Sequence, residues 1–181
     1  MKKILFTFLI LSSVLLAEAQ FYIGTGYMYI NESLSSSSST KINNNGAKIK
    51  FGYGEQKAYA VEFSINYIDN NSALLSTTDK EKYGFDVELM KAWDFDIYAL
   101  PFIRVGFGAG QMSSTARTGK NSISYGSFNG SIGTLLPLSE SFELEIAYEY
   151  KNISYQKTNT TLSGYPKSHQ NSIYTGINYR F

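Results

Sequence analysis

Few residues of this chain have side chains that commonly act in enzyme catalysis. His169 is the first candidate because it is the only histidine. Ser168 and Ser172 lie near it, so the segment holds a base and two hydroxyl nucleophiles. No His-x-Ser spacing occurs, and strand parity points His169 outward, away from Glu149. One histidine and no cysteine leave no His- or Cys-based metal cluster. The sequence therefore predicts no enzyme, with no catalytic, metal or cofactor site.

A glycine run, Gly106-x-Gly-x-Gly110, has the composition of a phosphate-binding loop. That function requires a helix directly after the glycines, and no helical pattern follows them here. We interpret these glycines as positions where a strand bends and side chains would crowd.

Charged residues are the larger candidate set, because they recur at every second position of otherwise apolar segments. In Ala58–Ile68, for example, Val61, Phe63 and Ile65 alternate with Glu62 and Ser64. This period of two indicates a strand with one apolar face and one polar face. The charged residues assigned to the polar faces are Lys48, Lys50, Glu62, Lys82, Asp86, Glu88, Asp96, Arg104, Glu143, Glu145, Glu149 and Arg180.

Eight segments with this alternation must position these charges. They are Phe21–Ile30, Ala47–Tyr53, Ala58–Ile68, Lys82–Met90, Phe95–Gly108, Ser122–Leu136, Phe142–Tyr150 and Ile173–Phe181. Their connections alternate between polar stretches of roughly 11 to 20 residues and turns of about 3 to 5, which is typical of barrels that cross an outer membrane. Pro101 lacks a backbone donor, and we expect a local bulge there. The leucines Leu74 and Leu75 are the only paired apolar residues in a predicted loop.

Aromatic residues gather at both ends of the apolar faces, as membrane-interface girdles do. The sequence therefore predicts an all-β fold, an eight-stranded antiparallel up-and-down transmembrane β-barrel with the charges inside. The alternative is a soluble lipocalin-like carrier with an apolar interior, which does not require aromatic bands at both strand ends.

The N-terminus reads as a secretion signal. Lys2 and Lys3 precede the apolar run Ile4–Leu16, and Ala17-Glu18-Ala19 has the small-residue pattern of a cleavage site. We expect residues 1–19 to be removed and residues 20–181 to form the barrel domain. Without the signal the chain carries equal numbers of basic and acidic residues, so bulk charge does not favour nucleic acid as a partner.

The chain resembles the OmpA-like family of small eight-stranded outer-membrane barrels, which includes opacity-type adhesins. The resemblance rests on the segments Phe21–Tyr27, Gly106–Gly110, Glu145–Tyr150 and Gly176–Phe181. It implies a bacterial outer-membrane location and contact with outer-membrane lipid and lipopolysaccharide. It also implies that Ile177, Tyr179 and Phe181 form the signal read by the barrel-assembly machinery. A monomer is expected.

Two functions from different classes remain open. The first is a structural or adhesive role carried by the external loops, with an extracellular ligand as partner. The second is a narrow, low-conductance porin in which inner charges act as a gate. The candidate gate residues are Glu62, Asp86, Glu88, Asp96, Arg104, Glu143, Glu145 and Arg180. An eight-stranded barrel is only wide enough for side chains to fill it, which favours a plug over a channel.

Overall fold

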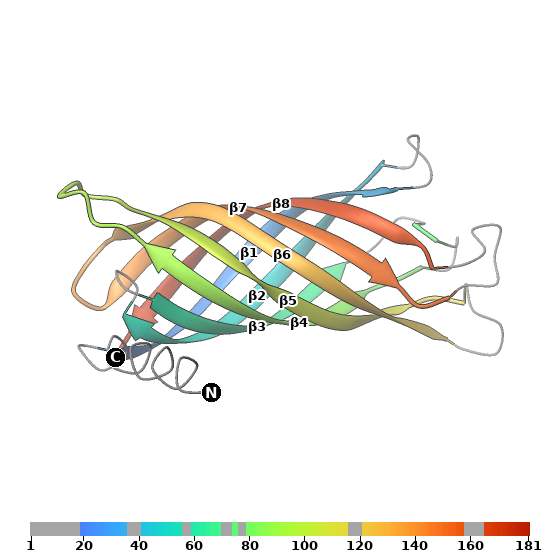
Figure 1. Ribbon diagram of the computed structural model, residues 1–181, viewed down its shortest axis with the longest axis horizontal. Coiled ribbons are helices and arrows are strands. Elements are labelled where there is room, and N and C mark those ends of the chain that lie inside the picture. The colour runs from blue at the N-terminus through green and yellow to red at the C-terminus, as the bar shows by residue number, and fades with distance from the viewer. Residues whose placement is uncertain are drawn as a thin grey trace, which may run out of the picture.

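A computed structural model describes residues 19–35, 41–55, 59–69, 74–75, 79–115, 121–157 and 165–181. Eight strands form one closed barrel in which each strand pairs with its sequence neighbours and β1 pairs with β8 (Figure 1). All pairs are antiparallel. The strands are β1 Gln20–Leu34, β2 Lys41–Glu55, β3 Tyr59–Asp69, β4 Lys82–Ala92, β5 Leu100–Ser113, β6 Ser122–Pro137, β7 Phe142–Tyr155 and β8 Lys167–Arg180. The predicted fold class is confirmed. The expected signal, residues 1–19, lies outside the described residues except for its last position.

The two ends of the barrel differ. At the end that we call the short-turn end, β2–β3, β4–β5 and β6–β7 are joined, and the backbone N–H of Phe181 donates to the carbonyl of Phe21 over 3.0 Å. At the other end, the long-loop end, the strands run farther than predicted. The segments assigned to loops there contain the end of β1, the start of β2 and the start of β8. Among the described residues no helix is long and apolar enough to cross a bilayer.

The bulge expected at Pro101 is absent, so that prediction is wrong. Pro101 pairs with Thr134, and the register continues without a break on both sides. The carbonyl of Pro101 accepts a hydrogen bond from the backbone N–H of Trp93, 2.9 Å away, just beyond the last paired residue of β4. In a β-strand the N–H and C=O of one residue point to the same side. Pro101 therefore lacks its N–H donor on the side that faces the β4–β5 turn, so no hydrogen bond inside the sheet is lost.

The outer surface is apolar and is bordered by aromatic rings at both ends. Near the long-loop end Tyr67 and Tyr83 contact each other with ring centroids 5.3 Å apart. At the short-turn end the rings of Phe21 and Tyr53 lie 4.6 Å apart. The side chains between these bands, such as Phe63, are exposed around the whole barrel wall. A continuous apolar wall with aromatic borders is the surface that a bilayer stabilises.

The inside contains both apolar and charged side chains. One apolar cluster comprises Tyr22, Met28, Ile30, Ala60, Ile68, Met90, Ala92, Leu100, Phe102, Leu135, Ala147 and Tyr174. Tyr22 fits because Gly52 faces it on the neighbouring strand, where a Cβ atom would lie 1.9 Å from the Tyr22 ring. Gly54, the residue before the last one of β2, has a φ of 138°, a conformation that favours glycine. The lumen is thus filled by side chains of matched size.

Candidate functional site

The lumen holds three connected groups of polar side chains. The first, which we call the Arg104 cluster, consists of Tyr22, Lys50, Glu62, Arg104, Glu145 and Asn178, from six different strands. The Arg104 guanidinium lies 2.5 Å from Glu62 through Nε and 3.0 Å from Glu145 through Nη2. Lys50 pairs with both of these carboxylates. Two cations therefore share two carboxylates in the middle of the barrel.

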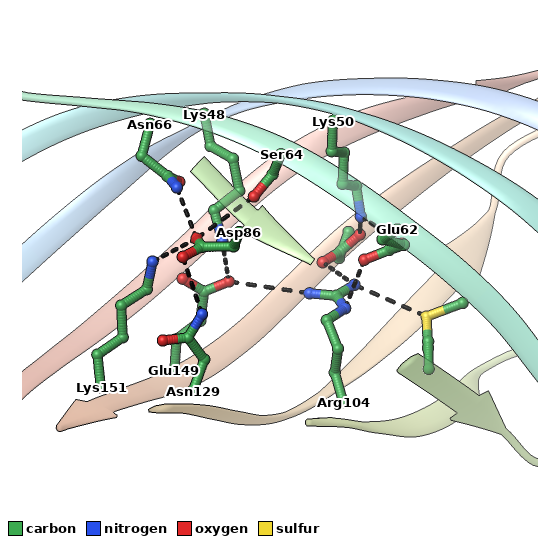
Figure 2. Close-up of polar contacts among 12 residues, drawn as sticks. Lys48, Lys50, Glu62, Ser64, Asn66, Asp86, Arg104, Asn129, Glu149 and Lys151 are labelled. Atoms are coloured by element: carbon green, nitrogen blue, oxygen red, sulfur yellow. Dashed lines mark hydrogen bonds and ion pairs between the residues drawn. The ribbon is translucent and has the colours of Figure 1, made fainter. Parts of the chain in front are cut away.

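The second group, the Asp86 cluster, lies beside the first. Asp86 accepts hydrogen bonds from Lys151 at 2.5 Å, Asn66 at 2.6 Å and Asn129 at 2.8 Å. A neighbouring pair, Lys48 and Glu149, is separated by 2.5 Å. Figure 2 shows that Glu149 also faces Arg104, and their closest atoms are 3.8 Å apart. Glu149 therefore links Lys48 to the Arg104 cluster.

The third group lies toward the long-loop end. Glu32 accepts hydrogen bonds from Lys82 at 2.5 Å, from the hydroxyl of Tyr155 at 2.8 Å and from Ser168 at 2.5 Å. All four side chains are buried. A carboxylate with one cation and two hydroxyl donors is well compensated, so this group joins β1, β4, β7 and β8 without leaving a free charge.

An apolar layer, which we call the mouth seal, covers the long-loop end of the lumen. It consists of Leu34, Ile42, Leu74, Leu75, Met112, Ile123, Ile153 and Tyr155. Leu74 and Leu75 come from the β3–β4 connection and are only 3% and 7% exposed. Their backbone N–H groups donate to one carboxylate oxygen of Asp79, at 2.9 and 2.5 Å, and the Ser114 hydroxyl donates to the other at 2.5 Å. The connection is thus tied down with its leucines inside the barrel.

When the buried ion pairs in the described part of the lumen are matched, one carboxylate has no close cation. Six cations face six carboxylates in the pairs Lys82–Glu32, Lys48–Glu149, Lys151–Asp86 and Arg180–Glu143 and in the Arg104–Lys50–Glu62–Glu145 group. Within the described residues Glu88, also buried, forms no ion pair within 4.0 Å. Lys48 and Arg104 attract its charge from farther away, and Glu149 and Asp86 repel it. Of these seven carboxylates, Glu88 is the one that has no close cation within the described residues.

The predicted inner residues mostly lie where the alternation places them. Glu62, Asp86, Glu88, Arg104, Glu143 and Glu145 are buried in the lumen. Arg180 pairs with Glu143 at the short-turn rim and is partly exposed. The placement of Asp96 is wrong: it lies exposed in the β4–β5 turn, with a φ of 57°, because β5 starts at Leu100 and not at Phe95. Whether the buried charges form a gate stays a prediction.

Two charged members of these groups were missed, namely Glu32 and Lys151. Glu32 lies in a segment assigned to a loop, and Lys151 lies just past a predicted strand end. Beyond the aromatic band the outward residues become polar, as at Asn31 and Ser33, while inward ones such as Leu34 become apolar. The apolar-out pattern therefore reverses there, although the period of two continues. Extending the alternation of inward and outward positions beyond the aromatic band would have placed both residues inside the barrel.

His169 faces outward, as predicted. Its Nε2 lies 3.0 Å from the Ser35 hydroxyl and its Nδ1 lies 2.7 Å from the Tyr150 hydroxyl. Ser168 points inward to Glu32, so His169 and Ser168 do not meet. In the described part of the chain no carboxylate contacts His169, and no group of three or more His, Asp or Glu side chains could hold a metal ion.

Comparison with known proteins identifies the fold. A family described as "Outer membrane protein beta-barrel domain" matches residues 4–181. No curated protein matches the sequence. Among solved structures, neisserial surface protein A (NspA) superposes with a TM-score of 0.65 at 15% identity, covering 91% of this chain and 100% of that chain.

Two further structures have the same fold. Ail, the attachment invasion locus protein of Yersinia pestis, superposes with a TM-score of 0.58 at 19% identity over 91% of this chain and 100% of its own. Ail is also known in complex with the heparin analogue sucrose octasulfate. OprG of Pseudomonas aeruginosa superposes with a TM-score of 0.54 at 14% identity, covering 90% of this chain and 96% of that chain. The long-loop end is therefore extracellular and the short-turn end periplasmic, and the chain belongs to the outer-membrane β-barrel family of the bacterial cell envelope.

Proposed function

We propose that this protein acts through its extracellular surface, where it binds anionic saccharide, and not by transport through its lumen. The observation that carries the proposal is the closed lumen: the charged network fills the middle, and Leu74 and Leu75 close the extracellular mouth. Asp79 holds these leucines through two backbone N–H groups. A barrel closed in this way offers its outer rim as its main contact surface.

The extracellular rim is basic where it is described. Lys41, Lys80, Lys157 and Lys167 are all exposed. Of the acidic residues described at this end, Glu32 and Asp79 are buried, Glu81 is half-buried and Asp69 is exposed, so the four exposed lysines outnumber the acidic side chains that reach the surface. The exposed charge therefore favours an anionic partner. The complex of Ail with a sulfated heparin analogue supports this class of ligand, as does the lipopolysaccharide that surrounds an outer-membrane barrel.

The first test is heparin binding by the refolded mature protein in detergent. Replacing the four rim lysines by serine should weaken binding by about 2 kcal/mol, or roughly thirtyfold, because exposed ionic contacts contribute up to about 1 kcal/mol each. Raising the salt concentration should weaken binding of the unaltered protein, because salt screens exposed charges. Titration at two salt concentrations measures both effects.

The single rim variant Lys167→Ser is compared with its matched control Lys91→Ser, which also removes one positive charge but at the periplasmic end. The control should leave heparin binding unchanged. Equal losses in both variants would mean that binding follows net charge alone, and undiminished binding by the fourfold variant would refute the basic rim as the contact surface.

A low-conductance porin is the second candidate. Arg104 contacts Glu62, Glu145 and Glu149, so it has three carboxylates between which it could exchange. An arginine that exchanges partners could open a narrow path through an otherwise filled lumen. The mouth seal argues against this function because it also covers the extracellular exit.

Single-channel recording in a planar bilayer separates the two candidates. We expect the refolded protein to be electrically silent, because an ion crossing the lumen would meet paired charges and then an apolar layer. Reproducible, salt-dependent conductance steps would favour the porin. If such steps occur and Arg104→Ala does not change them, the lumen conducts but Arg104 is not its gate.

A further inference from the structure

The periplasmic connection between β4 and β5 is longer and more apolar than its neighbour between β6 and β7. We call residues 93–99 the rim hairpin, and Figure 1 shows it in green, projecting beyond the barrel rim at the upper left. Trp93, Phe95, Ile97 and Tyr98 are exposed by 37, 63, 59 and 70%. Four large apolar side chains in one exposed turn form a patch that water does not favour.

The rim hairpin has a defined turn at its tip. The backbone N–H of Asp96 donates to the side-chain oxygen Oδ1 of Asp94 over 3.0 Å, and Asp96 has a φ of 57°. An Asp side chain that binds the backbone two residues later stabilises such turns, and aspartate tolerates positive φ better than most residues. At the base of the hairpin, Trp93 donates to the carbonyl of Pro101. The apolar residues are therefore presented by an ordered hairpin.

The position of the hairpin identifies what covers it. Trp93 and Phe95 continue the odd-numbered series of β4, whose members Val87 and Leu89 face lipid. Lys91, between the two pairs, places its ammonium 5.3 Å from the centre of the Tyr59 ring. A lysine beside an aromatic ring is typical of the membrane interface, where the stem lies in lipid and the charge in water.

The distance along the chain agrees with this position for Trp93, the first residue of the hairpin. Trp93 lies two residues beyond Lys91, which is about 7 Å along a strand. The interfacial zone on each side of a bilayer is about 5 to 7 Å thick. Tryptophan and tyrosine prefer this zone because their rings are apolar at one side and polar at the other. Asp94 and Asp96 can remain hydrated at the same depth.

We propose that the rim hairpin is an interfacial anchor that seats Trp93, Phe95 and Ile97 in the periplasmic leaflet of the outer membrane. The lipid-facing wall of β4 thereby continues onto the connection beyond it. Lipid contact at the periplasmic rim would fix the depth of the barrel in the membrane. This role lies at the opposite end from the saccharide contact and does not depend on it.

The sequence supplies its own reporter, because Trp93 is the only tryptophan. The full mature protein is refolded into phosphatidylcholine vesicles, some of them brominated on the acyl chains close to the headgroup. We expect blue-shifted Trp93 emission that is quenched by the brominated lipid and poorly quenched by acrylamide in the water. Emission at the wavelength of free tryptophan, with full acrylamide quenching and no effect of bromine, would overturn the proposal and favour a protein partner for the hairpin.

A pair of variants tests the neighbouring apolar residues. Phe95→Asp combined with Ile97→Asp should shift Trp93 emission to the red and reduce quenching by bromine, because the charged hairpin would leave the interface. Leu138→Asp is the matched control, since Leu138 is 57% exposed in the β6–β7 turn at the same rim. It should leave Trp93 emission unchanged. Heat-dependent mobility on gels confirms that each barrel has folded, and an identical response of both variants would refute a specific anchor.

Discussion

Replacing Glu145 by glutamine is expected to lower the free energy of unfolding by about 3 kcal/mol, whereas replacing Glu88 by glutamine is expected to change it by less than about 1 kcal/mol. Glu145 is fully buried and pairs with Lys50 and with Arg104, and it accepts a hydrogen bond from Asn178. Without its charge, Arg104 and Lys50 would share Glu62, with only Glu149, 3.8 Å from Arg104, as a further carboxylate. Breaking a buried pair costs more than the pair contributes, because the charge that remains has no partner.

Glu88 provides the matched control because the same substitution is made in the same lumen. Its carboxylate belongs to no close ion pair in the described chain, and Glu149 and Asp86 repel it while Lys48 and Arg104 attract it. Removing its charge takes away the cost of burying a carboxylate that has no close partner, together with the attraction and the repulsion by its neighbours. Glutamine keeps nearly the same volume and adds two donors.

Urea unfolding in detergent micelles, followed by loss of β-sheet circular dichroism, measures both variants. The midpoint should fall clearly for Glu145→Gln and stay near that of the unaltered protein for Glu88→Gln, with unchanged slopes. Equal losses would mean that Glu88 is paired as tightly as Glu145, and the lumen would then hold an additional positive charge beside it.

The sequence predicted the membrane-crossing part of this fold well, and the reason is physical. Where a strand crosses lipid, the outward side chain must be apolar and the inward one must fit a narrow polar lumen, so each residue carries a strong signal. Glu62, Asp86 and Glu145 were placed inside on this basis, and they are inside. Pairing partners could not be read in the same way, because they depend on which strands face each other across the barrel.

Outside the bilayer the same reasoning failed in both directions. At the extracellular end β1 continues past Ile30 to Leu34. Lipid no longer selects apolar outward residues there, so the alternation of apolar outward and polar inward residues reverses. At the periplasmic end, the apolar residues of the rim hairpin imitate a strand that would place Asp96 inside. Leu74 and Leu75 were recognised as unusual, but their insertion depends on Asp79, which lies beyond them in the same connection.

Replacing Phe181 by alanine is expected to remove most of the assembled barrel from the outer membrane of cells while leaving refolding in detergent nearly unchanged. The Phe181 side chain is 72% exposed, and its ring contacts that of Tyr179 with centroids 5.0 Å apart. An exposed ring with one such contact contributes about 1 kcal/mol or less to stability. A large loss confined to cells would therefore reflect recognition by the assembly machinery, as proposed for Ile177, Tyr179 and Phe181.

Phe21→Ala is the control that separates recognition from stability. Phe21 lies at the same periplasmic rim, is 64% exposed and contacts Tyr53 with centroids 4.6 Å apart, so its removal costs a similar contact. Phe21 belongs to β1 and not to the closing strand, and we expect normal amounts of assembled protein in its variant. Gel mobility of unheated outer-membrane fractions reports the folded amount in each case. Equal depletion of both variants would show that assembly depends on the aromatic rim as a whole. A difference between the two variants requires a signal specific to β8, because the two rings are similar in exposure and contacts.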